Sequence, residues 1–197
     1  MYRKNTREKL LEAAVDLFSV KGFDGTTVDE IAGTIGIKGP TIYKYFKGKE
    51  ALLVGIAEKA DAEYESGKLM KIRSSSSIDS GEALKAYTMN HIMFTMESEH
   101  IKKIRRLFTI EQFKDERFAR TATLHQITNI ETLYSGIFKD MMKRGLMNDG
   151  DNDILAFQYT SPITILLQWC DREPAIKEQI VAKIEKHIEL FIKEHCP

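Results

Sequence analysis

Lysine, threonine and tyrosine side chains gather in one short segment, residues 26–52, where their types and spacing suit contacts to nucleic acid. The residues that would share the exposed face of a short helix there are Lys38, Thr41, Tyr43, Lys44 and Tyr45. Ammonium and hydroxyl groups of this kind donate hydrogen bonds to phosphates, and lysine also reads base edges in the major groove. The segment therefore predicts a DNA contact.

The local sequence predicts two short helices joined by a sharp turn. Thr27 and Glu30 form a capping box, T-x-x-E, so a helix is expected to begin near Val28. Gly36 suits the left-handed backbone conformation that ends a helix and opens a tight turn. Pro40 suits the first turn of the next helix, because its missing N–H costs no hydrogen bond there. This layout is typical of a helix-turn-helix DNA reader.

Apolar residues at helical spacing would hold these two helices together. They are Val28, Ile31, Ala32, Ile35, Ile37, Ile42 and Phe46. Charge is also distributed unevenly, although the whole chain has a net charge of zero. Residues 36–49 contain four lysines and no acid, which is a local basic footprint that phosphates could occupy. A lysine-rich turn alone would more often be a solvated surface, but the helix-turn-helix spacing favours DNA binding.

With its flanking residues, the N-terminal quarter of the chain resembles the DNA-binding domain of the tetracycline-repressor (TetR) family. The matching residues are Leu11, Ala14, Leu17, Phe18, Lys21, Gly22, Phe23, Thr26, Thr27, Val28, Ile31, Ala32, Gly36, Ile37, Pro40, Thr41, Ile42, Tyr43, Tyr45, Phe46, Lys49, Glu50 and Leu52. The resemblance implies phosphate contacts from Thr27, Tyr45 and Lys49. It also implies that a second set of residues lies along the groove, namely Lys38, Gly39, Pro40, Thr41, Tyr43 and Lys44.

The same resemblance implies an all-α fold with two domains. Residues 1–48 would be a three-helix helix-turn-helix domain, and residues 49–197 a larger helical domain for ligand binding and dimerisation. The implied function is that of a transcriptional regulator, usually a repressor, which binds a near-palindromic DNA operator as a homodimer and is released by a small-molecule effector. The alternative is a helical ligand-binding or interaction protein whose helix-turn-helix is degenerate and does not bind DNA.

Composition and periodicity agree with a helical protein. Further helices are expected at about residues 6–21, 49–72, 80–97, 101–113, 116–144, 152–171 and 174–195, with a polar loop at 74–77. The chain has four prolines, two cysteines, no signal-peptide pattern and no apolar run of membrane-spanning length. We therefore expect a cytoplasmic protein with no membrane partner.

Two regions of the C-terminal part suggest surfaces for partners. Isoleucines and a phenylalanine recur every three or four residues in the last helix, at Ile176, Ile180, Ile184, Ile188 and Phe191. With the apolar helix before it, this stripe is expected to form the dimer seam, although it could also pack inside one subunit. The basic run at residues 100–106 is expected to be a solvated face, with a contact to the DNA-binding domain or to an acidic ligand as alternatives.

Aromatic and methionine residues in the middle of the chain suggest an effector pocket with mostly apolar walls. The candidates are Tyr87, His91, Met93, Phe94, Phe108, Tyr134, Phe138 and Trp169. An ordinary hydrophobic core is the alternative for any one of them. No catalytic motif, metal-ligand spacing or phosphate-binding loop stands in the sequence, so we expect neither an enzyme nor a metal or other cofactor.

Overall fold

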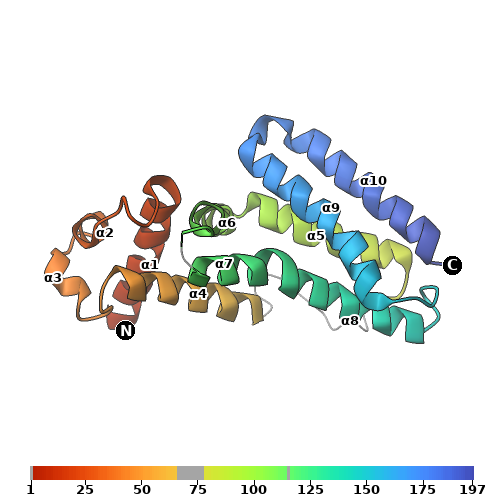
Figure 1. The fold of residues 1–197 in the computed structure, drawn as a ribbon, viewed down its shortest axis with the longest axis horizontal. Helices are drawn as coiled ribbons and strands as arrows, with labels where there is room; N and C mark the ends of the chain where they lie inside the picture. Colours follow the sequence, from red (N-terminus) through yellow and green to blue (C-terminus); the bar gives the residue numbers. More distant parts are fainter. Residues whose placement is uncertain (1, 66–77, 115) are drawn as a thin grey trace. The chain divides into compact units, whose positions relative to one another are not determined.

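The computed structural model describes residues 2–65, 78–114 and 116–197, and in these ranges every regular element is helical (Figure 1). The elements in chain order are α1 (Tyr2–Lys21), α2 (Val28–Thr34), α3 (Gly39–Ile42), α4 (Lys49–Glu65), α5 (Gly81–Glu97), α6 (Glu99–Glu111), α7 (Glu116–Thr123), the π-helical turn η2 (Leu124–Thr128), α8 (Asn129–Lys143), α9 (Asn152–Arg172), the 3-10 turn η3 (Pro174–Ile176) and α10 (Lys177–His195). The predicted all-α fold is confirmed.

Two compact units make up the chain. The first comprises Met1–Met70 and Glu99–Thr121, and the second comprises Lys71–Ser98 and Ala122–Pro197. The chain thus leaves the first unit and returns to it, so that α4 and α6 pack with the N-terminal helices. The sequence placed a functional boundary after residue 48, and that boundary stays a prediction. By packing alone, the N-terminal unit is larger than the helix-turn-helix domain.

In the first unit, α1 packs against α2, α4 and α6. The fully or almost fully buried side chains of this core are Leu10, Leu11, Ala14, Val15, Phe18, Ile31, Ala32, Ile42, Phe46, Leu52, Leu53, Ile56, Leu107, Phe108 and Phe118. The basic run at 100–106 lies on α6, and Lys103 forms an ion pair with Asp16 of α1 at 2.7 Å. The expectation of a purely solvated face is therefore wrong for Lys103, which contacts the N-terminal helix.

The second unit is built from α5, α8, α9 and α10 around its own hydrophobic core. Helices α9 and α10 run antiparallel, side by side (Figure 1). Ile180, Ile184 and Ile188 of α10 are at most 2% exposed and belong to this core, as does Phe191. The predicted role of this stripe as a dimer seam is wrong, because its side chains already pack inside the subunit. Periodicity shows that a helix face is buried, but not what covers it.

Several helix ends follow the expected local chemistry. Ser80 caps α5, where its hydroxyl oxygen accepts the Ala83 N–H at 3.1 Å, and Asp151 caps α9. The long helix expected at 116–144 is interrupted by η2, where the hydrogen-bond pattern widens by one residue for a single turn. The end of the helix expected at 49–72 and the polar loop at 74–77 lie outside the described residues. Across the described ranges, every helix is too short or too polar to cross a membrane.

Candidate nucleic-acid interface

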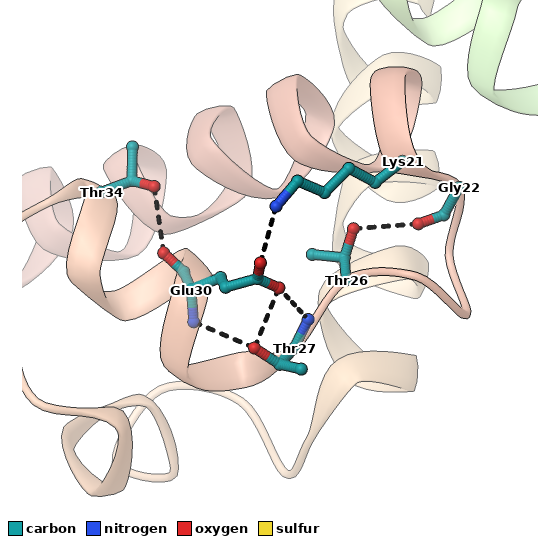
Figure 2. Close-up of polar contacts among 6 residues, drawn as sticks. All are labelled: Lys21, Gly22, Thr26, Thr27, Glu30 and Thr34. Carbon is teal, nitrogen blue, oxygen red and sulfur yellow. Dashed lines mark hydrogen bonds and ion pairs between the residues drawn. The ribbon is translucent and has the colours of Figure 1, made fainter.

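The start of α2 is fixed by the predicted capping box (Figure 2). Glu30 donates its backbone N–H to the Thr27 hydroxyl oxygen at 3.2 Å. In return, the Glu30 carboxylate accepts the Thr27 backbone N–H at 2.8 Å and the Thr27 hydroxyl at 3.0 Å. Two donors at the exposed helix start are thereby satisfied, and this fixes where α2 begins.

An ion pair ties the capping box to the preceding helix. The Lys21 ammonium at the end of α1 lies 2.6 Å from the Glu30 carboxylate (Figure 2). The hydrogen bond from Lys21, followed by those from the backbone and hydroxyl of Thr27, lowers the pKa of Glu30 from 4.5 to about 2. The Thr26 hydroxyl also donates to the carbonyl of Gly22 at 2.9 Å. The contacts of Thr26, Thr27 and Glu30 thus set the direction in which the chain enters α2.

The turn between α2 and α3 has the geometry that the sequence predicted. Gly36 has φ +73°, in the left-handed region that favours glycine, and the Ile37 N–H donates to the Ala32 carbonyl at 3.0 Å. Ala32 and Ile42 are completely buried, so α3 is held against α2 through small and aliphatic side chains. α3 is a single turn with Pro40 in its first turn.

The residues predicted to contact DNA differ in exposure. Lys38, Pro40, Tyr43 and Lys44 are exposed, and Tyr43 is 61% exposed despite its large ring. Of the others, Thr27 is exposed, Thr41, Tyr45 and Lys49 are half-buried, and Gly39 is buried. The structure therefore presents lysine and tyrosine groups on the surface formed by α3 and the loop after it. Gly39 can contribute to binding only through its backbone.

Asp29 of α2 covers Gly39 and explains the burial of that glycine. A Cβ atom placed on Gly39 would lie 1.6 Å from a carboxylate oxygen of Asp29, so any larger residue would displace the Asp29 side chain. The contact brings a carboxylate to the first turn of α3, where a negative charge suits the helix dipole. It also places one acid beside the lysine-rich surface.

Two cationic side chains of the first unit lie over aromatic rings. The Lys49 ammonium at the start of α4 lies 4.4 Å from the centre of the Phe23 ring, and the Arg7 guanidinium lies 5.0 Å from that of Phe46. Such cation–π contacts contribute about 0.5–1 kcal/mol at exposed sites and limit where the cation can move. Lys49 is therefore held at the start of α4 by a residue of the turn between α1 and α2.

Comparison with known proteins finds a family match in the N-terminal segment. Residues 10–56 match the family model described as bacterial regulatory proteins of the tetR family. This N-terminal segment is similar to the DNA-binding part of TetR-family regulators. The match covers the whole α1–α3 segment apart from the first residues of α1, together with the first turns of α4. The TetR resemblance expected from the sequence is thus confirmed.

Curated relatives agree with this match. The chain is 30% identical over 121 residues to the biofilm operon icaADBC HTH-type negative transcriptional regulator IcaR of Staphylococcus aureus strain Newman. That alignment covers 61% of this chain and 63% of IcaR, so the chain spans less than two thirds of the length of this relative. It is also 42% identical over 52 residues to the HTH-type transcriptional regulator YerO of Bacillus subtilis strain 168, covering 26% of this chain and 18% of YerO.

Solved structures extend the similarity of fold to nearly the whole chain. The structure of the SmeT–triclosan complex aligns with a TM-score of 0.77 at 16% identity, covering 98% of this chain and 92% of SmeT. SmeT is the repressor of the Stenotrophomonas maltophilia multidrug efflux pump SmeDEF. The flavonoid-responsive regulator FrrA aligns with a TM-score of 0.70 at 23% identity and covers 98% of each chain. At these identities the likeness shows the fold.

The second unit gathers part of the set of residues predicted to bind an effector. The Tyr134 hydroxyl donates to Thr88 at 3.1 Å, and the Thr88 and Tyr159 hydroxyl oxygens lie 2.8 Å apart. The rings of Tyr87 and Phe138 lie 6.3 and 6.0 Å from that of Tyr134. Three helices, α5, α8 and α9, thus meet at a hydrogen-bonded group of three hydroxyls inside an aromatic core. The sequence reading missed Thr88 and Tyr159, whose only signal was their place on apolar helices.

Removal from water sets the protonation of two residues in this region. It lowers the pKa of the half-buried His91 from 6.5 to about 4, so the imidazole is neutral at pH 7. It also raises the pKa of the Tyr87 phenol to about 12, so that hydroxyl stays protonated. The polar groups here are therefore uncharged at pH 7, which suits an uncharged or weakly polar molecule better than an ion.

The remaining predicted effector residues differ in their surroundings. Phe108 is buried in the first unit. Trp169 is 39% exposed, its ring N–H donates to Glu173 at 3.1 Å, and the Lys183 ammonium lies 5.7 Å from its ring. Met93 is half-buried and Phe94 is exposed on α5. Within the described ranges, no group of three acidic, histidine or cysteine residues could hold a metal ion.

Proposed function

We propose that this chain is a transcriptional repressor that binds operator DNA as a homodimer and releases it when a small molecule binds the C-terminal unit. The proposal is supported by the geometry of the helix-turn-helix. The start of α2 is fixed by its capping box, α2 and α3 pack through buried side chains, and lysine and tyrosine side chains around α3 are exposed. The presence of Tyr43, 61% exposed, beside the exposed Lys44 favours DNA binding over a degenerate helix-turn-helix. IcaR, a negative regulator by name, supports repression.

In this proposal the predicted contacts divide into two kinds. Lys49 and Tyr45 bind phosphates, and Lys38, Pro40, Tyr43 and Lys44 face the major groove with Gly39 and Thr41. Thr27 joins the phosphate contacts only by exchanging its hydroxyl bond with Glu30 for one with a phosphate. With no arginine in α3, base readout relies on the lysines and on the shape of the DNA.

The exposed face of α9 supports a homodimer through the last two helices. Ile154, Phe157 and Ile165 are 54–65% exposed, and Leu190 of α10 is 58% exposed. Three large apolar residues on one face of a helix are costly in water and suit a partner surface. A second copy would offer the same face under twofold symmetry. Such a dimer could present two copies of α3 to successive major grooves, about 34 Å apart, and would require a near-palindromic operator.

The effector, in the same proposal, is a mostly apolar or aromatic molecule held by few hydrogen bonds. The neutral hydroxyls of Thr88, Tyr134 and Tyr159 are its candidate polar contacts in the second unit. SmeT has been solved with triclosan, and FrrA is named as flavonoid-responsive; a comparable response of this chain is part of the proposal. Native mass spectrometry of the purified protein, before and after organic extraction, would detect a retained molecule.

Removal of one phosphate contact tests the DNA-binding proposal. The probe is a duplex selected from a random library by the wild-type protein, and the measurement is its dissociation constant across a salt series. Lys49→Ala should weaken binding to every duplex and lower the slope of log affinity against log salt by about one, because one fewer counterion is released. Lys139→Ala, which removes an exposed lysine of α8 in the second unit, is the control and should leave the slope unchanged. An equal slope in all three proteins would remove Lys49 from the phosphate contacts.

A further inference from the structure

Glu111, the last residue of α6, is a buried carboxylate in an unfavourable position. Its side chain is 1% exposed, although a buried charge requires compensating partners. It also stands at the C-terminal end of its helix, where the helix dipole disfavours a negative charge. A residue placed at such a cost must make contacts that offset it.

Those contacts join α6 to the turn between α1 and α2. The Glu111 carboxylate accepts the backbone N–H of Phe23 at 2.9 Å and lies 3.1 Å from the Lys114 ammonium. The turn has a special backbone at Gly22, with φ +76°, and a Cβ atom there would lie 3.0 Å from the Glu111 carboxylate. The carboxylate and the turn therefore fit closely, and glycine at position 22 suits both the positive φ and the close approach.

Phe23 connects this hydrogen bond to the proposed DNA contacts. Its ring packs against Phe18 of α1 and Phe118 of α7, at centroid distances of 5.3 and 5.7 Å. The Lys49 ammonium lies over the same ring at 4.4 Å. The residues that follow Phe23 lead directly into Thr26, which bonds back to Gly22 and precedes α2. The turn thus contains the aromatic ring on which the Lys49 ammonium lies, and it also leads directly into α2.

We infer that Glu111 is a positioning residue for DNA binding: its bond to the Phe23 N–H fixes the α1–α2 turn, and the turn places Lys49 and the start of α2. A shift of α6 would then reach the DNA-contacting residues through one hydrogen bond. The ion pair between Lys103 and Asp16, two helical turns earlier on α6, fixes the same helix along α1. This inference rests on the proposed DNA-binding function, and deepens it.

Two substitutions separate the hydrogen bond from the charge. Glu111→Gln keeps an oxygen that accepts the Phe23 N–H, whereas Glu111→Leu fills a similar volume and accepts nothing. Hydrogen exchange at the Phe23 amide should accelerate roughly 10- to 150-fold in Glu111→Leu, the factor expected for losing a bond to a charged acceptor. Glu111→Gln still offers a neutral acceptor, so it should accelerate exchange much less than Glu111→Leu does. If the leucine variant does not fold, Glu111→Asp keeps the charge but shortens the reach and should give the same acceleration.

A double-mutant cycle tests the link to Lys49. With the selected duplex as probe, Glu111→Leu should lower the salt slope as Lys49→Ala does, and Lys49→Ala should add little in the Glu111→Leu background. Rescue of the slope by Glu111→Gln would exclude a loss of general stability as the cause. Additive effects of the two changes, or an unchanged Phe23 amide, would overturn the inference. A wild-type protein that selects no duplex would instead refute the DNA-binding proposal, and the amide measurement would still decide whether Glu111 fixes the turn.

Discussion

From the exposed face of α9 we predict that Ile165→Lys converts the proposed dimer to a folded monomer. Ile165 is 65% exposed in the single chain. Complete burial of an isoleucine side chain contributes about 1.5–3 kcal/mol, so burying the exposed part contributes about 1–2 kcal/mol. In a twofold dimer each residue occurs twice, which gives about 2–4 kcal/mol and a roughly 30- to 900-fold weaker dimer. The lysine charge would add to this loss.

Sedimentation velocity over a dilution series measures the effect, and circular dichroism confirms that the variant is folded. Val20→Lys is the matched control, because Val20 is 72% exposed on α1 and the same charge there should leave the dimer intact. Ile184→Asp gives a contrast. Ile184 is completely buried in the core of its own subunit, so this change should unfold the second unit. An Ile165→Lys protein with the dimer affinity of the wild type would show that the α9 face is not the interface.

Two further predictions concern pH and local stability. Thr27→Ala removes the cap of α2 and should destabilise the first unit by about 0.5–2 kcal/mol in thermal or urea unfolding; it should also raise the pKa of Glu30, now about 2, in an NMR titration. Because that pKa is lowered from 4.5 on folding, the Glu30 contribution is fully present above about pH 4.5 and is lost as the pH falls towards 2. The pKa of His91 falls from 6.5 to about 4 on folding, so between these pH values the unfolded chain binds more protons than the folded chain. The free energy of unfolding should therefore decrease as the pH is lowered from 6.5 to 4. His91→Leu should flatten this dependence, and an equally steep profile would show that His91 is not the responsible group.

The helix-turn-helix could be predicted from the order of the residues, because its signals are local. The reciprocal bonds of Thr27 and Glu30 need residues only three apart, and the positive φ of Gly36 depends on the absence of a side chain at one position. The spacing of Ile42 and Phe46 also predicted correctly that both side chains are buried in the helix-turn-helix. The helical class and most helix ends followed from the same kind of local rule.

The surfaces that those helices cover could not be predicted in this way, because such contacts join residues far apart in the chain. The stripe containing Ile184 had the periodicity of a buried face, but the sequence could not say whether a partner or its own subunit buries it. Phe108 and Tyr134 looked alike as aromatic residues of a pocket, yet they belong to different compact units. Glu111 carried no signal at all, since its partner, the Phe23 N–H, is 88 residues away and is a backbone group that every sequence possesses.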